Sequence, residues 1–192
     1  MAVNIEQEIR PSSTAVVLRD AASGLEVLLL RRHRQLKVGG GHWVFPGGTV
    51  DPDDVADAKG DRMTAFHLAA VRETEEEAQI QLDQRRLQLI SWWTTPPSIK
   101  RRYETAFFIA DCPGQQVVVD GEEADDYLWC HPGELVGSHQ QGELALMPPT
   151  LVTLTELSSC ATVADARGAG YPPQNQRCRW SRVYALRRRC GV

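Results

Sequence analysis

The segment "VRETEEEAQI", Val71 to Ile80, places four glutamates within five positions. Carboxylates this close together repel one another unless solvent or a cation screens them. Runs of like charge are common on the solvated faces of surface helices. The segment is therefore either an ordinary surface or part of a cation site, and the surrounding sequence has to distinguish the two.

Hydrophobic spacing predicts that these glutamates lie on a helix. The helix is expected over Thr64–Gln79, with Asp61 or Thr64 as its N-cap. An α-helix turns by about 100° per residue. By that arithmetic the core-facing side, opposite Glu73, should carry Leu68, Val71 and Ala78.

The same geometry separates three of the glutamates from the fourth. Glu76 and Glu77 lie within about 60° of Glu73 around the helix, whereas Glu75 lies about 160° away. We refer to Glu73, Glu76 and Glu77 as the glutamate trio. Three carboxylates on one helical face suit Mg²⁺ or Mn²⁺, which prefer oxygen ligands and share phosphate oxygens of a substrate. Glu75 is predicted to be an ordinary surface residue.

The remaining elements alternate between short strands and helices. β-branched and aliphatic runs are typical of strands, and "AASG" between the first two predicts a hairpin. Proline followed by helical spacing predicts two late helices. Together the patterns predict strands over 13–20, 25–32, 86–93, 103–110, 116–120 and 125–132, and helices over 132–140 and 148–160. Strands before, between and after isolated helices indicate one domain of the mixed α/β (α+β) class, not a doubly wound sheet.

Composition argues against several classes of protein. No apolar run approaches the ~18 residues that span a bilayer, and the N-terminus lacks the pattern of a secretory signal, so no membrane partner is expected. Five cysteines form no C-x-x-C pair, which favours the cytoplasm over a disulfide framework or a zinc site. The net charge is −4, but residues 167–192 contain seven arginines and no acidic residue, so subtracting +7 leaves −11 for the rest. So acidic a body is a poor binder of phosphate backbones, and no nucleic-acid partner is expected.

The glutamate helix and the glycine-rich loop before it resemble the Nudix box. That motif is Gly, five residues, Glu, seven residues, then R-E-U-x-E-E-x-G-U, with U aliphatic. Arg72–Ile80 matches its second half, "FPGG" at Phe45–Gly48 supplies the glycine, and Asp54 stands at the first glutamate position. Thr74 replaces an aliphatic residue, Gln79 replaces the last glycine, and ten extra residues separate Asp54 from Arg72. No departure removes a carboxylate of the trio. Gln79 is expected to change how the helix ends, because glycine accepts a positive φ at low cost.

The resemblance implies a Nudix fold over 13–164, in which a mixed sheet lies between helices and the box forms a loop–helix–loop. It implies hydrolysis of a diphosphate that links a nucleoside to another moiety. It further implies that the trio and the Gly48 carbonyl hold Mg²⁺ or Mn²⁺, that one glutamate is the base, and that Arg72 braces a neighbouring glutamate. Glu123 is expected to add a metal ligand or a base. The arginine-rich tail over 165–192 is predicted to be loosely held and dispensable.

A second stretch, "LLLRRHRQLKVGGGHWVFPGG" from Leu28 to Gly48, is similar to the segment preceding the box in coenzyme A diphosphatase-type Nudix enzymes. Lys37 stands where those enzymes have an arginine. This similarity implies coenzyme A or an acyl-coenzyme A as the substrate, with Arg32 and Lys37 binding its outer phosphates and Phe45 lying at the substrate. Tyr103 is a candidate to stack on the adenine ring, as are Trp92 and Trp93.

Two alternatives stay open. One is a hydrolase of ADP-ribose, a dinucleotide or a nucleotide sugar. The other is a non-catalytic Nudix-fold module that binds a nucleotide. The glutamate trio argues against this alternative, because a protein that only binds has no need to tolerate the repulsion among three carboxylates. The acidic body and the basic tail also leave room for a homodimer.

Overall fold

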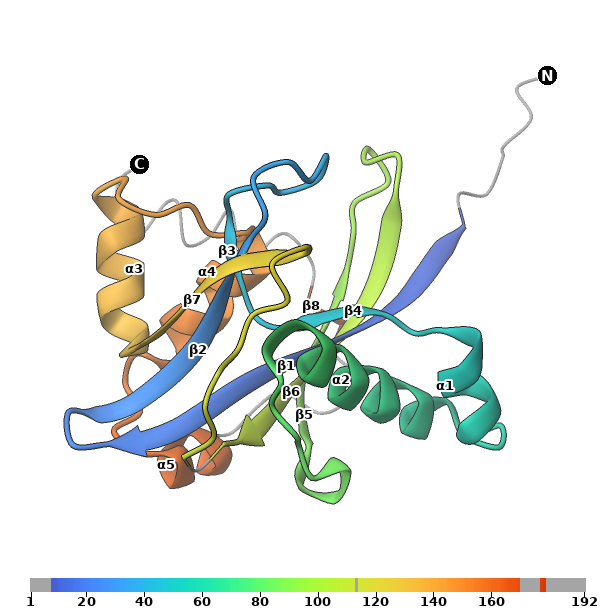
Figure 1. Cartoon of the computed structure of the whole chain (residues 1–192), viewed down its shortest axis with the longest axis horizontal. Helices are drawn as coiled ribbons and strands as arrows, with labels where there is room; N and C mark the ends of the chain where they lie inside the picture. Colours follow the sequence, from blue (N-terminus) through green and yellow to red (C-terminus); the bar gives the residue numbers. More distant parts are fainter. Residues whose placement is uncertain (1–7, 113, 170–176, 179–192) are drawn as a thin grey trace.

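A long antiparallel hairpin lies at the centre of the sheet (Figure 1). The computed structural model describes residues 8–112, 114–169 and 177–178 of the 192-residue chain. Within these residues one eight-stranded mixed sheet has the order β3-β2-β1-β6-β5-β8, with β4 also pairing with β1 and β7 with β2. Its strands are β1 Ile9–Ala21, β2 Gly24–Arg32, β3 Trp43–Val44, β4 Gly47–Thr49, β5 Gln88–Thr94, β6 Arg102–Asp111, β7 Ala124–Cys130 and β8 Arg177–Cys178. The β1–β6 and β5–β8 pairs are parallel.

Helices cover both faces of this sheet. Along β1, Ala15 and Val17 point to one face and pack with α2, while Val16 and Leu18 point to the other and pack with α3 and α4. This alternation is the period-two pattern of a strand that is buried on both faces. The helices are α1 Pro52–Asp57, α2 Arg62–Ala78, α3 Pro132–Gln140, α4 Pro148–Leu157 and α5 Val163–Gly168, with a 3-10 turn at Gln84–Arg86. The predicted architecture, a mixed sheet between helices, is confirmed. No described helix has the length and apolarity that a bilayer span requires.

Most predicted elements are present, and one predicted strand is wrong. Residues 116–120 form no strand. Val117 is buried against the α2 side of the core, and the Val118 N–H donates a hydrogen bond to the Ala78 carbonyl at 3.0 Å. Val117 and Val119 therefore pack on the α2 side of the core, and the segment does not join the sheet. The sequence patterns also did not predict α1, α5 or β8.

The orientation of α2 differs from the predicted one. Phe66, Ala70, Glu73 and Glu77 follow a four-three-four spacing, and their side chains are all largely buried. Thus the face that packs on the sheet is the face that carries the glutamates. Of the three residues predicted to face the core, Ala78 is buried and Val71 packs at the margin, but Leu68 is only half-buried. The prediction failed because it assumed that the trio faces away from the core, whereas two of its carboxylates lie against the β4 backbone.

A side chain determines where α2 begins, and a backbone conformation determines where it ends. Asp61 is the N-cap, and its carboxylate accepts a hydrogen bond from the Thr64 N–H at 3.0 Å. At the other end Gln79 adopts the left-handed conformation, with φ of 54°, and its N–H donates to the Glu75 carbonyl at 2.9 Å. The expectation that Gln79 changes the helix end is therefore wrong. Glutamine takes the conformation that glycine takes more cheaply.

The segment between Asp54 and Arg72, ten residues longer than usual, is mostly helical. Residues 55–71 comprise the end of α1, a turn in which Gly60 has φ of 88°, and the first ten residues of α2. The Phe66 ring lies in this segment and packs edge-to-face on Trp92 of β5, with ring centroids 4.9 Å apart. The segment thus anchors α2 on the sheet ahead of the glutamates.

The folded domain extends past the predicted boundary at residue 164. Ala166 of α5 is fully buried. The Arg167 guanidinium donates to the Asp111 carboxylate and to the Arg86 carbonyl, both at 2.8 Å. Residues 165–168 therefore belong to the domain, which begins at Ile9 and not at residue 13. Residues 170–176 and 179–192 of the predicted tail lie outside the described residues.

Replacing Arg167 with alanine should lower the free energy of unfolding by about 1.5–3 kcal/mol, the range for lost hydrogen bonds to a charged group. That corresponds to a decrease of about 3–12 °C in Tm for a chain of this size. The matched control is Arg85→Ala, because Arg85 is 90% exposed and pairs with Asp83 two residues away. Thermal unfolding of both variants checks this. Equal Tm values would show that α5 does not need Arg167.

Candidate active site

Two glutamates of α2 lie against the two glycines of β4. The Glu77 carboxylate accepts a hydrogen bond from the Gly47 N–H at 2.9 Å. The Glu73 carboxylate occupies the space where residue 48 would carry a side chain, because a Cβ on Gly48 would overlap it. The Gly48 carbonyl accepts a hydrogen bond from the Ser12 hydroxyl at 2.7 Å. Sequence spacing did not reveal Ser12, since it lies 36 residues from Gly48 in the chain.

The two glycines should respond differently to substitution by alanine. At Gly47 a Cβ would overlap the backbone of Ser13 and Thr14, and φ is +150°. Gly47→Ala should therefore destabilise the fold by about 2 kcal/mol or more. At Gly48 the Cβ would meet only the flexible end of Glu73. Gly48→Ala should keep Tm near the parent value and lower kcat. Tm and kcat of the two variants test this contrast, and loss of folding by both would contradict it.

Burial makes the two inner carboxylates weak acids. The Glu77 side chain is 6% exposed, and burial raises its pKa to about 8, with further repulsion from Glu73 and Glu123. The Glu73 side chain is 12% exposed, and burial raises its pKa to about 7 although Arg72 opposes the shift. A pKa near neutrality suits a group that must exchange a proton at physiological pH. Glu76 is different, since its side chain is 57% exposed.

Arg72 links the start of the box to the trio. Its guanidinium donates to the Asp54 carboxylate at 3.0 and 3.3 Å and to the Thr49 carbonyl at 2.9 Å. The same group lies 3.0 Å from Glu73 and donates to Glu76 at 2.9 Å. The Asp54 side chain is 6% exposed and also accepts the Asp51 N–H at 2.9 Å. Asp54 therefore holds Arg72, and Arg72 braces two glutamates of the trio.

Glu123 comes to the same place from a different element. It is exposed and immediately precedes β7, and its carbonyl accepts the His33 N–H at 2.8 Å. Its negative charge raises the pKa of both Glu73 and Glu77, and the Val118 N–H, five residues before it, donates to the Ala78 carbonyl at the end of α2 at 3.0 Å. The structure thus brings Glu123 to the inner pair from about 50 residues further along the chain.

The arginines of β2 have separate surroundings. Arg31 is engaged in structure: its guanidinium donates to Asp125 at 2.6 Å, lies 3.3 Å from Asp126, and stacks over the Trp43 ring at 5.7 Å. Arg32 donates only a long bond to the Val38 carbonyl at 3.2 Å, and its charge lowers the pKa of Glu77. Lys37 is exposed on the loop that follows. Arg32 is therefore the arginine of this strand whose charge acts on an inner carboxylate.

The aromatic candidates do not join the carboxylates. Phe45 is 3% exposed and packs edge-to-face on Phe107 in the core under α3 and α4. Its expected position at the substrate is wrong, because the FPGG loop turns this ring inward. Trp92 packs on Phe66 of α2, and Trp93 is buried in the opposite core. Tyr103 is half-buried near the start of β6 and by strand alternation points to the α3 side, away from α2.

The donor set fits a hard divalent cation. Among the described residues, no three histidine, cysteine or acidic side chains already form a ready coordination shell. However, Glu73 and Glu77 are carboxylates whose pKa values are raised by burial, so a nearby positive charge would be needed to keep both ionised. The Glu73 carboxylate fills the space left by the missing side chain of Gly48, and Glu76 lies one helical turn away on the exposed side. Carboxylate and carbonyl oxygens are the ligands that Mg²⁺ and Mn²⁺ prefer.

Comparison with known proteins gives one consistent family. The model of the NUDIX domain matches residues 9–149. Among solved structures, the NUDIX hydrolase from Alicyclobacillus acidocaldarius is similar at 27% identity with a TM-score of 0.76, over 88% of this chain and 100% of that chain. The MutT protein from Methanosarcina mazei Go1 has 21% identity and a TM-score of 0.55, over 70% of this chain and 85% of that chain. The NUDIX domain of Shewanella oneidensis NrtR, complexed with ADP ribose, has 16% identity and a TM-score of 0.54, over 71% of this chain and 84% of that chain. A search of curated proteins gave no match.

Proposed function

This chain belongs to the Nudix family and is a hydrolase of nucleoside diphosphate-linked compounds. From that premise we propose that its substrate is coenzyme A or an acyl-coenzyme A. The observation that carries the proposal is Arg32: its charge lowers the pKa of the buried Glu77, and its guanidinium pairs with no carboxylate of the described residues. Arg32 and the exposed Lys37 occupy the positions at which coenzyme A diphosphatase-type sequences place phosphate-binding residues. A cation that acts on the carboxylates and a second cation on the loop after β2 suit a ligand with a diphosphate and an additional phosphate.

We propose that Glu73, Glu76, Glu77 and the Gly48 carbonyl hold Mg²⁺ or Mn²⁺. Such an ion neutralises charge on the diphosphate oxygens and lowers the pKa of a water molecule. Arg72 has the separate task of holding Glu73 and Glu76 in place through its own anchor on Asp54. Without that anchor the carboxylates would gain freedom, which a preorganised site has to avoid.

In the proposed reaction, the carboxylates of the site together take up the proton of the attacking water. Glu73 and Glu77 have pKa values of about 7 and about 8, and Glu123 lies next to them, so these carboxylates form one coupled system. We propose that this system accepts the proton of the attacking water. The water oxygen forms a bond to one phosphorus as the bond from that phosphorus to the bridging oxygen breaks, giving 3′,5′-ADP and a phosphopantetheine. Arg32 binds the phosphate oxygens on which negative charge accumulates.

The runner-up substrate is ADP-ribose, a dinucleotide or a nucleotide sugar. The NrtR domain complexed with ADP ribose shares the fold, and a fold by itself does not select among such ligands. A reducing cytoplasm is proposed as the compartment, supported by the free thiols of Cys112, Cys130 and Cys160. Neither a homodimer nor the exclusion of nucleic acid has been tested, and both stay predictions.

A substrate panel tests the proposed function. The protein is incubated with coenzyme A, ADP-ribose, a dinucleoside polyphosphate and a nucleotide sugar, each with Mg²⁺, Mn²⁺ or a chelator, and products are identified by mass spectrometry. We expect hydrolysis that requires the cation and is fastest with coenzyme A. Binding of a compound without turnover under every condition would support a sensor module and contradict the proposal.

Binding of Mg²⁺ should stabilise the protein more strongly at pH 8 than at pH 6. The folded-state pKa values of Glu73 and Glu77 lie above the ordinary 4.5, so the stability that their protonated forms provide is full below about pH 4.5 and is lost as the pH rises through 7 and 8. A cation binds the deprotonated forms and recovers that loss. At about 100 times its Kd, Mg²⁺ should raise Tm by about 5–10 °C at pH 8.

The same thermal scans at pH 6 should show a clearly smaller Mg²⁺ effect. Glu77→Gln, in which residue 77 cannot titrate, is the control and should lose the part of the pH dependence that comes from Glu77, while Glu73 still titrates near pH 7. A Mg²⁺ effect that is independent of pH in the parent would contradict the proposal that the inner carboxylates hold the ion.

A further inference from the structure

Glu123 lies on a turn that the Asp120 side chain builds. One Asp120 carboxylate oxygen accepts the Glu123 N–H at 3.0 Å, and the other accepts the Ala124 N–H at 2.9 Å. The Gly121 N–H closes the turn on the Ala124 carbonyl at 2.9 Å, and Gly121 has φ of 77°. Both oxygens of one aspartate therefore bind the backbone on either side of the Glu123 Cα. An aspartate at such a position fixes a loop that would otherwise sample many conformations.

The strand that follows is fastened to β2 at the same point. The Glu123 carbonyl accepts the His33 N–H at 2.8 Å, and Ala124 pairs with Arg32. The register between the strands then shifts, because Arg31 pairs with Asp126 and the ladder skips Asp125. The backbone around Glu123 is thus held by Asp120 on one side and by β2 on the other.

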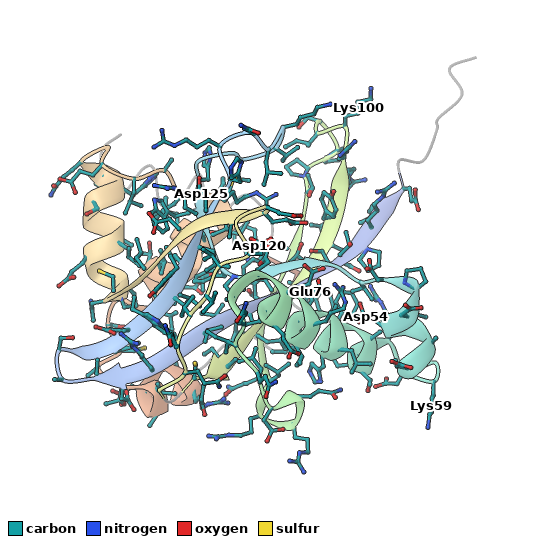
Figure 2. The ribbon with its side chains drawn as sticks, in the orientation of Figure 1. Asp54, Lys59, Glu76, Lys100, Asp120 and Asp125 are labelled. Atoms are coloured by element: carbon teal, nitrogen blue, oxygen red, sulfur yellow. The ribbon has the colours of Figure 1, made fainter. Side chains whose placement is uncertain are left out.

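This arrangement fixes the position of the Glu123 backbone relative to α2, which carries Glu73 and Glu77. The Val118 N–H donates a hydrogen bond to the Ala78 carbonyl at 3.0 Å, which places the segment that leads to Glu123 at the end of α2 next to Glu77. The negative charge of Glu123 raises the pKa of both Glu73 and Glu77. Figure 2 labels Asp120 in the segment leading into β7 and Glu76 on α2.

We infer that Asp120 is a positioning residue for Glu123: its two hydrogen bonds to the 123–124 backbone hold the Glu123 carboxylate beside the carboxylates of α2. The inference rests on the proposed function, since it assigns Glu123 a part in the hydrolysis, but it does not depend on which diphosphate is the substrate. A capping role that only stabilises the turn makes a different prediction, because it would leave the contribution of Glu123 to catalysis unchanged.

A double-mutant cycle with the best substrate of the panel and saturating Mg²⁺ tests this inference. Glu123→Gln should lower kcat by about 100-fold or more, as expected for loss of a proton-transfer group. Asp120→Ala should lower kcat about tenfold or more through misplacement, with KM nearly unchanged. In Glu123→Gln the further change Asp120→Ala should have little effect, because there is no carboxylate left to position. Asp120→Asn should recover part of the loss, since its one amide oxygen accepts one of the two bonds.

The matched control is Asp83→Ala. Asp83 caps the turn at Gln84–Arg86 by accepting the Arg85 N–H at 3.0 Å, so it makes the same kind of bond in a turn outside the site. Its loss should leave kcat unchanged. Hydrogen exchange should show faster exchange of the amides at 123 and 124 in Asp120→Ala only.

Each outcome separates the two proposals. Multiplicative losses in the cycle, or slow exchange at 123 and 124 in Asp120→Ala, would overturn the role of Asp120 and leave the proposed function standing. A parent that prefers ADP-ribose would overturn the coenzyme A assignment alone, because the cycle runs on whichever substrate is best. An inactive parent would overturn both.

Discussion

Replacing Glu77 with glutamine should lower kcat by at least about 100-fold, the scale expected when a group that stabilises transition-state charge is lost. Glutamine has nearly the same shape, and its amide oxygen can still accept the Gly47 N–H that now binds Glu77. The substitution therefore removes a charge and a titrating group while keeping the contact. Because a buried carboxylate with a raised pKa destabilises the metal-free protein at pH 8, the variant should also unfold at a temperature no lower than the parent under those conditions.

Glu75→Gln is the matched control on the same helix. Glu75 is exposed, and its carboxylate accepts only a 3.2 Å hydrogen bond from the Gln81 side chain. Its kcat should stay within about twofold of the parent, as for a surface substitution. Steady-state kinetics and thermal scans of both variants measure the kcat and Tm values that are compared. Equal losses of kcat for Glu75→Gln and Glu77→Gln would show that the assignment of roles along α2 is wrong.

The second large effect concerns Arg32. The sequence suggested that it binds an outer phosphate, but because its charge acts on Glu77 we propose that it binds the diphosphate next to the carboxylates. Arg32→Ala should lower kcat/KM by about tenfold to a hundredfold, the cost of losing a hydrogen bond to a charged group. The loss should be similar for coenzyme A and for 3′-dephospho-coenzyme A, because both carry the diphosphate.

Lys37 should behave differently from Arg32. It is exposed on the loop after β2, which suits contact with the 3′-phosphate as a point charge. Lys37→Ala should lower kcat/KM about tenfold for coenzyme A and much less for 3′-dephospho-coenzyme A. Arg34→Ala, in the same loop and also exposed, is the control. Loss of the same size on both compounds in Lys37→Ala would contradict a role in binding the 3′-phosphate.

The family and much of the architecture could be predicted from the sequence because they depend on local patterns. Alternating and helical spacing identified the β1–β2 hairpin and α3 to within a few residues, and the order of FPGG and the glutamate helix identified the box. The trio was also local, since angles around one helix follow from residue spacing.

The features that could not be predicted from the sequence depend on tertiary contacts. The face of α2 that packs on the sheet was predicted wrongly, since helical periodicity does not show that a carboxylate will pack on a glycine of a strand. Phe45 looked like a substrate contact because it precedes the glycines, but the turn of the loop buries its ring on Phe107. Asp120 gave no signal, because its importance comes from two backbone bonds next to Glu123.

The measurement that tests the central claim most directly is the ratio of kcat/KM values of the unmodified protein for coenzyme A and ADP-ribose, with Mg²⁺ and with products identified by mass spectrometry. Arg32, whose charge acts on Glu77, and the exposed Lys37 predict that coenzyme A is preferred and that it is cut at the diphosphate to give 3′,5′-ADP and a phosphopantetheine. A preference for ADP-ribose, or coenzyme A left intact while ADP-ribose is hydrolysed, would contradict the account and leave a general nucleoside-diphosphate hydrolase in its place.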